Sequence, residues 1–168
     1  LLLYSLTFDS LALRQKWDSF SCTCVSFSNG GHLLAAGSLI IKVISTYSSK
    51  VVTSLRGHNL TVKSIEWAPN DSFFISSGID GNVYKWSAKT WDRETQVSLP
   101  TQCLSALLTE SPSSLQLHGD NESDAGHISS TNYNILIATS NSTIYDMELQ
   151  CERMPNVKKT LTAINMPV

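Results

Sequence analysis

The 168-residue sequence contains few charged side chains, and neither sign of charge gathers in one place. Charged residues make up 15% of the chain, and the 12 Lys and Arg against 14 Asp and Glu give a formal net charge of -2. The basic residues are scattered from Arg14 to Lys159. Nucleic acids and anionic membranes are bound by clustered basic side chains. The sequence therefore predicts no nucleic-acid partner and no membrane partner.

Long hydrophobic runs are missing as well. Apolar runs such as Leu39 to Ile41 are far shorter than the roughly 20 residues that a membrane-spanning helix needs. We therefore expect a soluble chain. The first residues, LLLYSLTF, show neither an initiator Met nor a basic segment ahead of an apolar core, which is typical of an internal fragment of a longer protein.

Cysteine and metal-ligand patterns are sparse. The four cysteines, Cys22, Cys24, Cys103 and Cys151, are too dispersed for a disulfide scaffold and include no Cys-x-x-Cys pair. We expect buried free thiols, with no metal and no cofactor. His118 and His127 lie in a polar stretch without further ligands at fixed spacing and are expected to be solvent-exposed.

Catalytic motifs are absent too. The sequence has no Gly-x-Ser-x-Gly nucleophile turn and no glycine-rich phosphate loop. We therefore expect a protein that is not an enzyme and has no catalytic residues. Four Asn-x-Ser/Thr triplets, at Asn59, Asn70, Asn121 and Asn141, leave a secreted and glycosylated protein as an alternative.

What the sequence does contain is a turn signal inside alternating apolar residues. The stretch GIDGNVYKWS, Gly78 to Ser87, has Asp80-Gly81 between two such segments. An Asp-Gly pair in this setting predicts a hairpin with a two-residue type I′ turn. Residues 73–77 and 83–87 are the predicted partner strands.

The surrounding sequence repeats with a period of about 40 residues. Residues 22–45 and 62–87 share the order strand, turn, strand, tight turn, strand. Residues 50–58 and 93–100 each add a fourth strand. Four short strands per repeat predict an all-β fold built of propeller blades.

The second repeat resembles a WD repeat. It has Gly57-His58, then VKSIEWAPND, then FISSGIDG, and then Trp86. In that family a histidine, a serine or threonine, an aspartate and a tryptophan form a hydrogen-bonded structural tetrad. The resemblance assigns these roles to His58, Ser76, Asp80 and Trp86.

The neighbouring repeats depart from the pattern, since the first has Ile44 at the tryptophan position and the third is interrupted. The resemblance implies an arc of about three to four blades from a larger ring, which further blades of the same chain close. We expect the last strands of one blade in residues 1–19 and the first strand of another in 159–168. Between them we expect three blades, in 20–57, 58–100 and 101–158, the last of which contains a polar insertion at 109–132.

Leu55 to Glu94 looks most like the axonemal members of the WD-repeat family. This implies a non-catalytic cytoplasmic scaffold in the axoneme of cilia or flagella, near doublet microtubules and dynein arms, with axonemal proteins and dynein-associated complexes as partners. The alternatives are a WD-repeat scaffold of another intracellular complex, or a secreted propeller receptor or hydrolase. Trp91 is a candidate partner-binding residue, or else it covers the edge of its own blade.

Overall fold

The computed structural model describes residues 1–18, 20–110, 133–149 and 157–162, and every regular element among them is a β-strand. The first two strands, Leu2–Leu6 (β1) and Leu11–Lys16 (β2), pair with each other in a two-stranded sheet. Three four-stranded antiparallel sheets follow. Because each strand pairs with the next one along the chain, each sheet is a simple meander.

The three sheets have closely similar strand layouts. The first contains Cys24–Phe27 (β3), Leu33–Gly37 (β4), Ile41–Ser45 (β5) and Val51–Leu55 (β6). The second contains Val62–Trp67 (β7), Phe73–Gly78 (β8), Asn82–Ser87 (β9) and Arg93–Ser98 (β10). The third contains Cys103–Glu110 (β11), Tyr133–Thr139 (β12), Thr143–Leu149 (β13) and Val157–Thr162 (β14).

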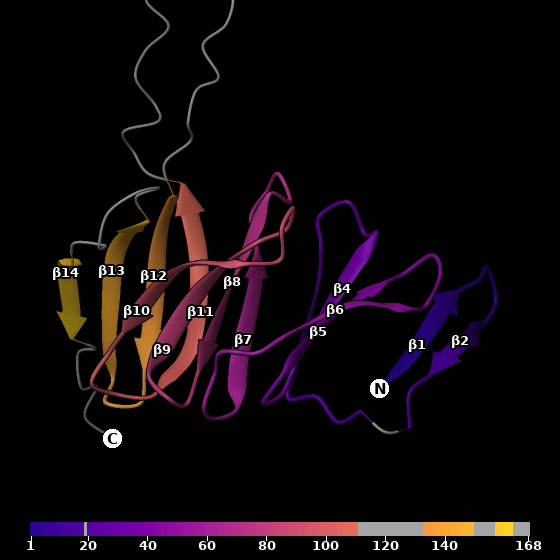
Figure 1. The fold of residues 1–168 in the computed structure, drawn as a ribbon, viewed down its shortest axis with the longest axis horizontal. Coiled ribbons are helices and arrows are strands. Elements are labelled where there is room, and N and C mark those ends of the chain that lie inside the picture. Colours follow the sequence, from indigo (N-terminus) through magenta and orange to yellow (C-terminus); the bar gives the residue numbers. More distant parts are fainter. Residues whose placement is uncertain (19, 111–132, 150–156, 163–168) are drawn as a thin grey trace, which may run out of the picture.

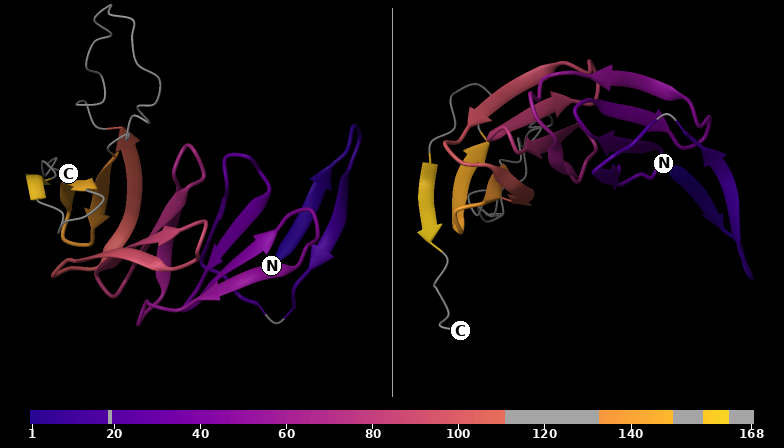
Figure 2. Two further views of the ribbon diagram at one scale, coloured as in Figure 1. Left: turned by 45° about the horizontal axis from the view of Figure 1, so that its top comes forward. Right: turned by 90° about the horizontal axis from the view of Figure 1, so that it is seen from below.

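The sheets stand side by side and follow a curved arc (Figures 1 and 2). The first strands of the sheets meet, since β7 lies against both β3 and β11. One apolar cluster fills the seam between the first and second sheets, and another fills the seam between the second and third. Both faces of the second sheet are therefore covered, which explains why all six residues of β8 are buried.

The predicted hairpin is confirmed, but the predicted type I′ turn is not found. Phe73 pairs with Ser87, and Ser77 pairs with Val83. Asp80 does not have the positive φ that a type I′ turn requires, whereas Gly81 does, at +75°. The N–H of Gly81 donates to the carbonyl of Gly78 over 3.1 Å, so the connection is a three-residue loop that ends in a left-handed glycine.

Gly81 also holds the chain that leads to the next sheet. Its carbonyl accepts the N–H of Leu99 over 2.8 Å. A Cβ at this glycine would lie 2.5 Å from the Leu99 carbonyl oxygen, so both the positive φ and the close approach require glycine here.

The third sheet differs from the predicted division of the chain. Residues from 159 onward were expected to begin another blade, whereas Val157–Thr162 pairs with β13 and forms the fourth strand of the third sheet. Pairing with this segment satisfies backbone N–H and C=O groups on the edge of β13 that would otherwise be open. Thr109 and Glu110, expected in the insertion, belong to β11, and the rest of the insertion lies outside the described residues with His118 and His127.

The cysteines fit the predictions in part. Cys103 is a buried free thiol, and burial raises its pKa to about 11. Cys22 and Cys24 are free but only half-buried, and Cys151 lies outside the described residues. Within the described ranges, no helix has the length and apolarity needed to cross a membrane.

Candidate functional site

The structure brings together the four residues that the sequence proposed as a tetrad. Ser76 lies on β8 and Trp86 on β9, while His58 and Asp80 lie in the connections before β7 and between β8 and β9. The indole Nε1 of Trp86 is 2.9 Å from the Ser76 Oγ, which is 2.8 Å from the Nε2 of His58. The Nδ1 of His58 is 3.1 Å from the Asp80 Oδ1.

The indole N–H at one end of the chain and the carboxylate at the other end together assign the protons between them. An indole N–H can only donate, so the Ser76 oxygen accepts from Trp86. The single hydroxyl proton of Ser76 then donates to the Nε2 of His58. A nitrogen that accepts belongs to a neutral imidazole, whose proton is on Nδ1 and donates to the Asp80 carboxylate. The chain thus runs in one direction, from indole to carboxylate.

The pKa values of its two titratable groups agree with this assignment. Burial lowers the pKa of His58 below its ordinary value, more than the neighbouring Asp80 raises it. Burial raises the pKa of Asp80, but hydrogen bonds from the Asn59 N–H, from His58 and from Asn82 outweigh it and hold that pKa below its ordinary value. A neutral imidazole therefore donates to an ionised carboxylate.

Neighbouring aromatic rings hold the histidine and the tryptophan in place. The ring of Tyr84 meets the His58 ring edge-on at 4.5 Å between centroids, and its hydroxyl donates to the Gly57 carbonyl over 3.0 Å. Tyr84 also packs edge-on against Trp86, at 5.7 Å. The imidazole is therefore fixed by packing as well as by hydrogen bonds.

The connectivity of Ser76, His58 and Asp80 is that of a hydrolase triad, but its position excludes that chemistry. A catalytic serine must reach a substrate carbonyl with an accessible oxygen. Ser76 is 0% exposed, and its oxygen already accepts the indole proton. The described residues also contain no group of three or more His, Cys, Asp or Glu side chains placed to hold a metal ion. The arrangement is suited to locking the second sheet.

We expect His58→Ala and Asp80→Ala each to lower the free energy of unfolding by about 1–3 kcal/mol, because each leaves buried polar partners unpaired. The double variant should lose less than the sum of the two single losses, since the second change removes a partner that is already gone. Thermal unfolding of the three variants measures the coupling. Additive losses would mean that the two side chains act independently.

The tetrad also predicts loss of stability in acid. The unfolded chain takes up a proton on His58 near its ordinary pKa of 6.5, whereas the folded chain takes it up only at a lower pH. The stabilisation is therefore complete above pH 6.5 and decreases as the pH falls below it. The melting temperature should drop between neutral pH and about pH 5, and His58→Gln should make that drop shallower. An identical pH dependence in the variant would contradict the assignment.

Sequence reasoning missed a second polar contact, which joins two sheets. Asp71 lies in the turn between β7 and β8, and its carboxylate reaches the turn between β3 and β4. It accepts the N–H of Asn29 over 2.7 Å, the N–H of Gly30 over 2.8 Å and the Asn29 amide over 3.0 Å. Burial raises the pKa of Asp71, but these hydrogen bonds outweigh it and lower that pKa below its ordinary value.

The local sequence marks the turn that holds Asp71, but it does not indicate which residues Asp71 contacts. Asp71 has a φ of +55°, at the place where the first repeat has Gly31 with a φ of +68°. Asn and Asp tolerate this conformation better than other side chains do, so Asn70-Asp71 marks a turn. Nothing in the local sequence says that the carboxylate contacts residues about 40 positions earlier in the chain.

We expect Asp71→Gly, which tolerates the positive φ of this position, to lower the free energy of unfolding by roughly 1–2 kcal/mol, because three hydrogen bonds to a partly exposed carboxylate are lost. The loss should appear as faster hydrogen exchange at the seam between the first two sheets. Asp9→Gly is the matched control, since it removes an exposed carboxylate from the β1–β2 turn. Equal effects of the two changes would show that Asp71 does not join the sheets.

Trp91 lies in the turn between β9 and β10. It is half-buried and packs against the apolar cluster between the first and second sheets. Its φ of +64° is unusual for a bulky residue. Its role in binding a partner stays a prediction.

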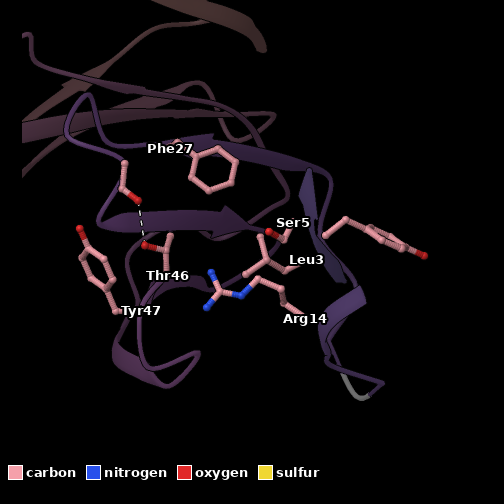
Figure 3. A pocket seen from close by; sticks show the side chains of 8 residues that line it. Leu3, Ser5, Arg14, Phe27, Thr46 and Tyr47 are labelled. Carbon is pink, nitrogen blue, oxygen red and sulfur yellow. Dashed lines mark hydrogen bonds between the residues drawn. The ribbon is translucent and has the colours of Figure 1, made fainter. Parts of the chain in front are cut away.

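A hollow of about 320 Å³ lies between the β1–β2 sheet and the first four-stranded sheet. Figure 3 shows Leu3, Arg14, Phe27 and Tyr47 around it. Phe27 is 53% exposed there, whereas Trp67 in the corresponding position of the second sheet is buried and donates to the Ser26 carbonyl over 3.2 Å. Arg14 is the one charged side chain among the described residues that line the hollow, so no acid–base pair faces it.

Comparison with known proteins supports the architecture. Residues 49–87 match the family model "WD domain, G-beta repeat". The β-propeller domain of Cps50 (Swd1) from Myceliophteria thermophila superposes with a TM-score of 0.63 at 19% identity, over 84% of this chain and 40% of that one.

Several curated proteins are similar in sequence. The chain is 36% identical over 111 residues to cilia- and flagella-associated protein 57 of Mus musculus, which covers 66% of this chain and 9% of the mouse protein. It is 31% identical over 86 residues to cilia- and flagella-associated protein 57 C of Tetrahymena thermophila, covering 47% of this chain and 7% of that protein.

A third relative is WD repeat and HMG-box DNA-binding protein 1 of Mus musculus, at 33% identity over 78 residues, 45% of this chain and 7% of that protein. The chain thus spans less than a tenth of the length of these relatives. The matched repeat, the successive four-stranded sheets and the structural similarity agree. The chain is an arc of a WD-repeat β-propeller.

Proposed function

We propose that the chain is part of a non-catalytic WD-repeat scaffold in the axoneme of cilia or flagella. The observation that carries the proposal is its similarity to two proteins named for cilia and flagella, one from a mouse and one from a ciliate. WD-repeat propellers generally mediate protein–protein interactions. The proposed location is the axonemal cytoskeleton, and the proposed partners are axonemal proteins, including dynein-associated complexes.

The build of the arc supports a scaffold role. Both faces of the second sheet are buried against its neighbours, and its polar tetrad lies inside rather than in an accessible cleft. This leaves the turns and the outer strands as the surface available to other proteins. Proteins that position partners need such a rigid frame with variable loops.

A WD-repeat scaffold of another intracellular complex is the second candidate. The observation that favours it is the similarity to WD-repeat proteins that are not named for cilia, such as the HMG-box DNA-binding protein. The location of the full-length protein separates the two candidates.

The test is fractionation of isolated cilia from a ciliated cell that expresses the full-length protein. Detergent removes the ciliary membrane and the soluble matrix, and an axonemal scaffold should remain with the doublet microtubules. A soluble matrix protein serves as the control for complete extraction. Release of the protein into the detergent fraction, without enrichment in cilia over the cell body, would reject the axonemal location and favour the second candidate.

A further inference from the structure

A groove of about 530 Å³ runs along the outer rim of the arc, between the first and second sheets. One wall is the end of β6 with Arg56, and the other is the turn between β9 and β10 with Trp91, followed by Arg93 at the start of β10. Strand β6 is the last strand of its sheet and pairs with β5 alone among the described residues. Its other edge therefore offers backbone N–H and C=O groups to an extended peptide.

The tryptophan in this groove is not required by its turn. The same turn in the first sheet has Ser49 at the corresponding position, with a φ of +57°, and the Ser49 N–H donates to the Ser45 carbonyl over 2.8 Å. The Trp91 N–H donates to the Ser87 carbonyl over 3.0 Å in the same way. A serine thus makes the turn equally well. A bulky side chain with positive φ is strained, and such strain is concentrated at functional positions.

The charges along the groove are mainly positive. Arg56 and Arg93 are exposed, and neither forms an ion pair with another described residue. The Arg93 guanidinium lies 5.0 Å from the centroid of the Tyr84 ring, which holds it at the rim. Asp92 contributes one negative charge to the same lining. Arginine and tryptophan are enriched among the residues that carry most of the binding energy in protein interfaces, and guanidinium groups bind carboxylates in a bidentate manner.

We propose that this groove binds an extended acidic segment of a partner protein, whose carboxylates contact Arg56 and Arg93 and whose apolar side chain packs against Trp91. The proposal rests on the scaffold function, for which it specifies the surface and the chemistry of the partner. Because the contact depends on exposed charges, binding weakens as the salt concentration rises.

The test measures binding of a labelled peptide, in which glutamate alternates with leucine, to the full-length protein by fluorescence anisotropy. A peptide with lysine in place of glutamate is the control ligand. Arg56→Glu and Trp91→Asn alter the groove, and asparagine is chosen because it tolerates the positive φ of the turn. Lys50→Glu is the matched control, since it makes the same charge change at an exposed position outside the groove lining.

The acidic peptide should bind saturably and the lysine peptide should not. Arg56→Glu and Trp91→Asn should each weaken binding by about tenfold or more, with Lys50→Glu unchanged. Equal weakening by Arg56→Glu and Lys50→Glu would show attraction to net charge alone and overturn the proposal, as would absence of binding or preference for the lysine peptide.

Hydrogen exchange of the unaltered protein gives a second measurement that needs no variant. The acidic peptide should slow exchange at residues 53–56 and 90–93, and protection confined to other segments would overturn the proposal. The result is independent of the cilia fractionation. A protein that leaves the axoneme with detergent can still bind the acidic peptide, and an axonemal protein can fail to bind it.

Discussion

Replacing Trp86 by alanine should lower the free energy of unfolding of the second blade by roughly 3–5 kcal/mol, the range for removing a large buried aromatic side chain. The indole is buried, stacks on Phe74 at 6.5 Å between centroids and meets Tyr84 edge-on. Its removal leaves a cavity in the seam between two sheets. It also removes the indole N–H, which is the donor at one end of the hydrogen-bonded tetrad.

The Trp86→Phe variant separates these two contributions. It keeps most of the ring volume and removes the N–H, so the loss should be close to that of one buried hydrogen bond, about 1–2 kcal/mol. Hydrogen exchange at the amides of β8 and β9 measures both variants within the full-length protein, where global unfolding need not be two-state. Unchanged protection in Trp86→Ala would contradict an anchoring role for this tryptophan.

Phe74→Ala should be about as damaging, again by roughly 3–5 kcal/mol. Phe74 is 0% exposed and lies next to both tryptophans of the cluster, with its ring 4.8 Å from that of Trp67. Truncation leaves a void between two large rings that cannot approach each other, because each is hydrogen-bonded, Trp67 to Ser26 and Trp86 to Ser76.

Phe27→Ala is the matched control for this prediction, because Phe27 is a strand phenylalanine that is 53% exposed. Its replacement should cost much less than that of Phe74. Melting temperatures and hydrogen exchange compare the two variants under the same conditions. Equal losses at both positions would mean that burial in the seam does not determine the stability of this part of the arc.

The local parts of the fold could be predicted from the sequence because their signals are local. Alternating apolar residues and the Asp80-Gly81 pair predict the β8–β9 hairpin, and the two partner strands are the expected ones. The turn type could not be predicted from that pair alone. Here the loop is fixed by distant groups, since the Asp80 carboxylate accepts the Asn59 N–H over 2.9 Å and Gly81 bonds to Leu99.

The candidate sites also differ in whether their residues could be predicted from the sequence. The tetrad residues could be proposed because a WD-repeat resemblance relates distant positions of one repeat. The contact of Asp71 with Asn29 and the groove at Trp91 lie between repeats, where chain spacing gives no signal. The pairing of β14 was mispredicted for a related reason, since the polar residues around 150–156 interrupt the pattern that would connect it to β13.

The loop from Ile79 to Gly81 has a mechanical consequence. The Ile79 N–H donates to the Thr61 carbonyl over 3.0 Å, and the Gly81 carbonyl accepts the Leu99 N–H. Three consecutive residues therefore fasten the chain entering the second sheet and the chain leaving it. Tension on the connection between the second and third sheets is shared between the covalent chain into β10 and the hydrogen bond from Leu99 to Gly81. One short loop therefore couples the position of the chain that enters the second sheet to the position of the chain that leaves it.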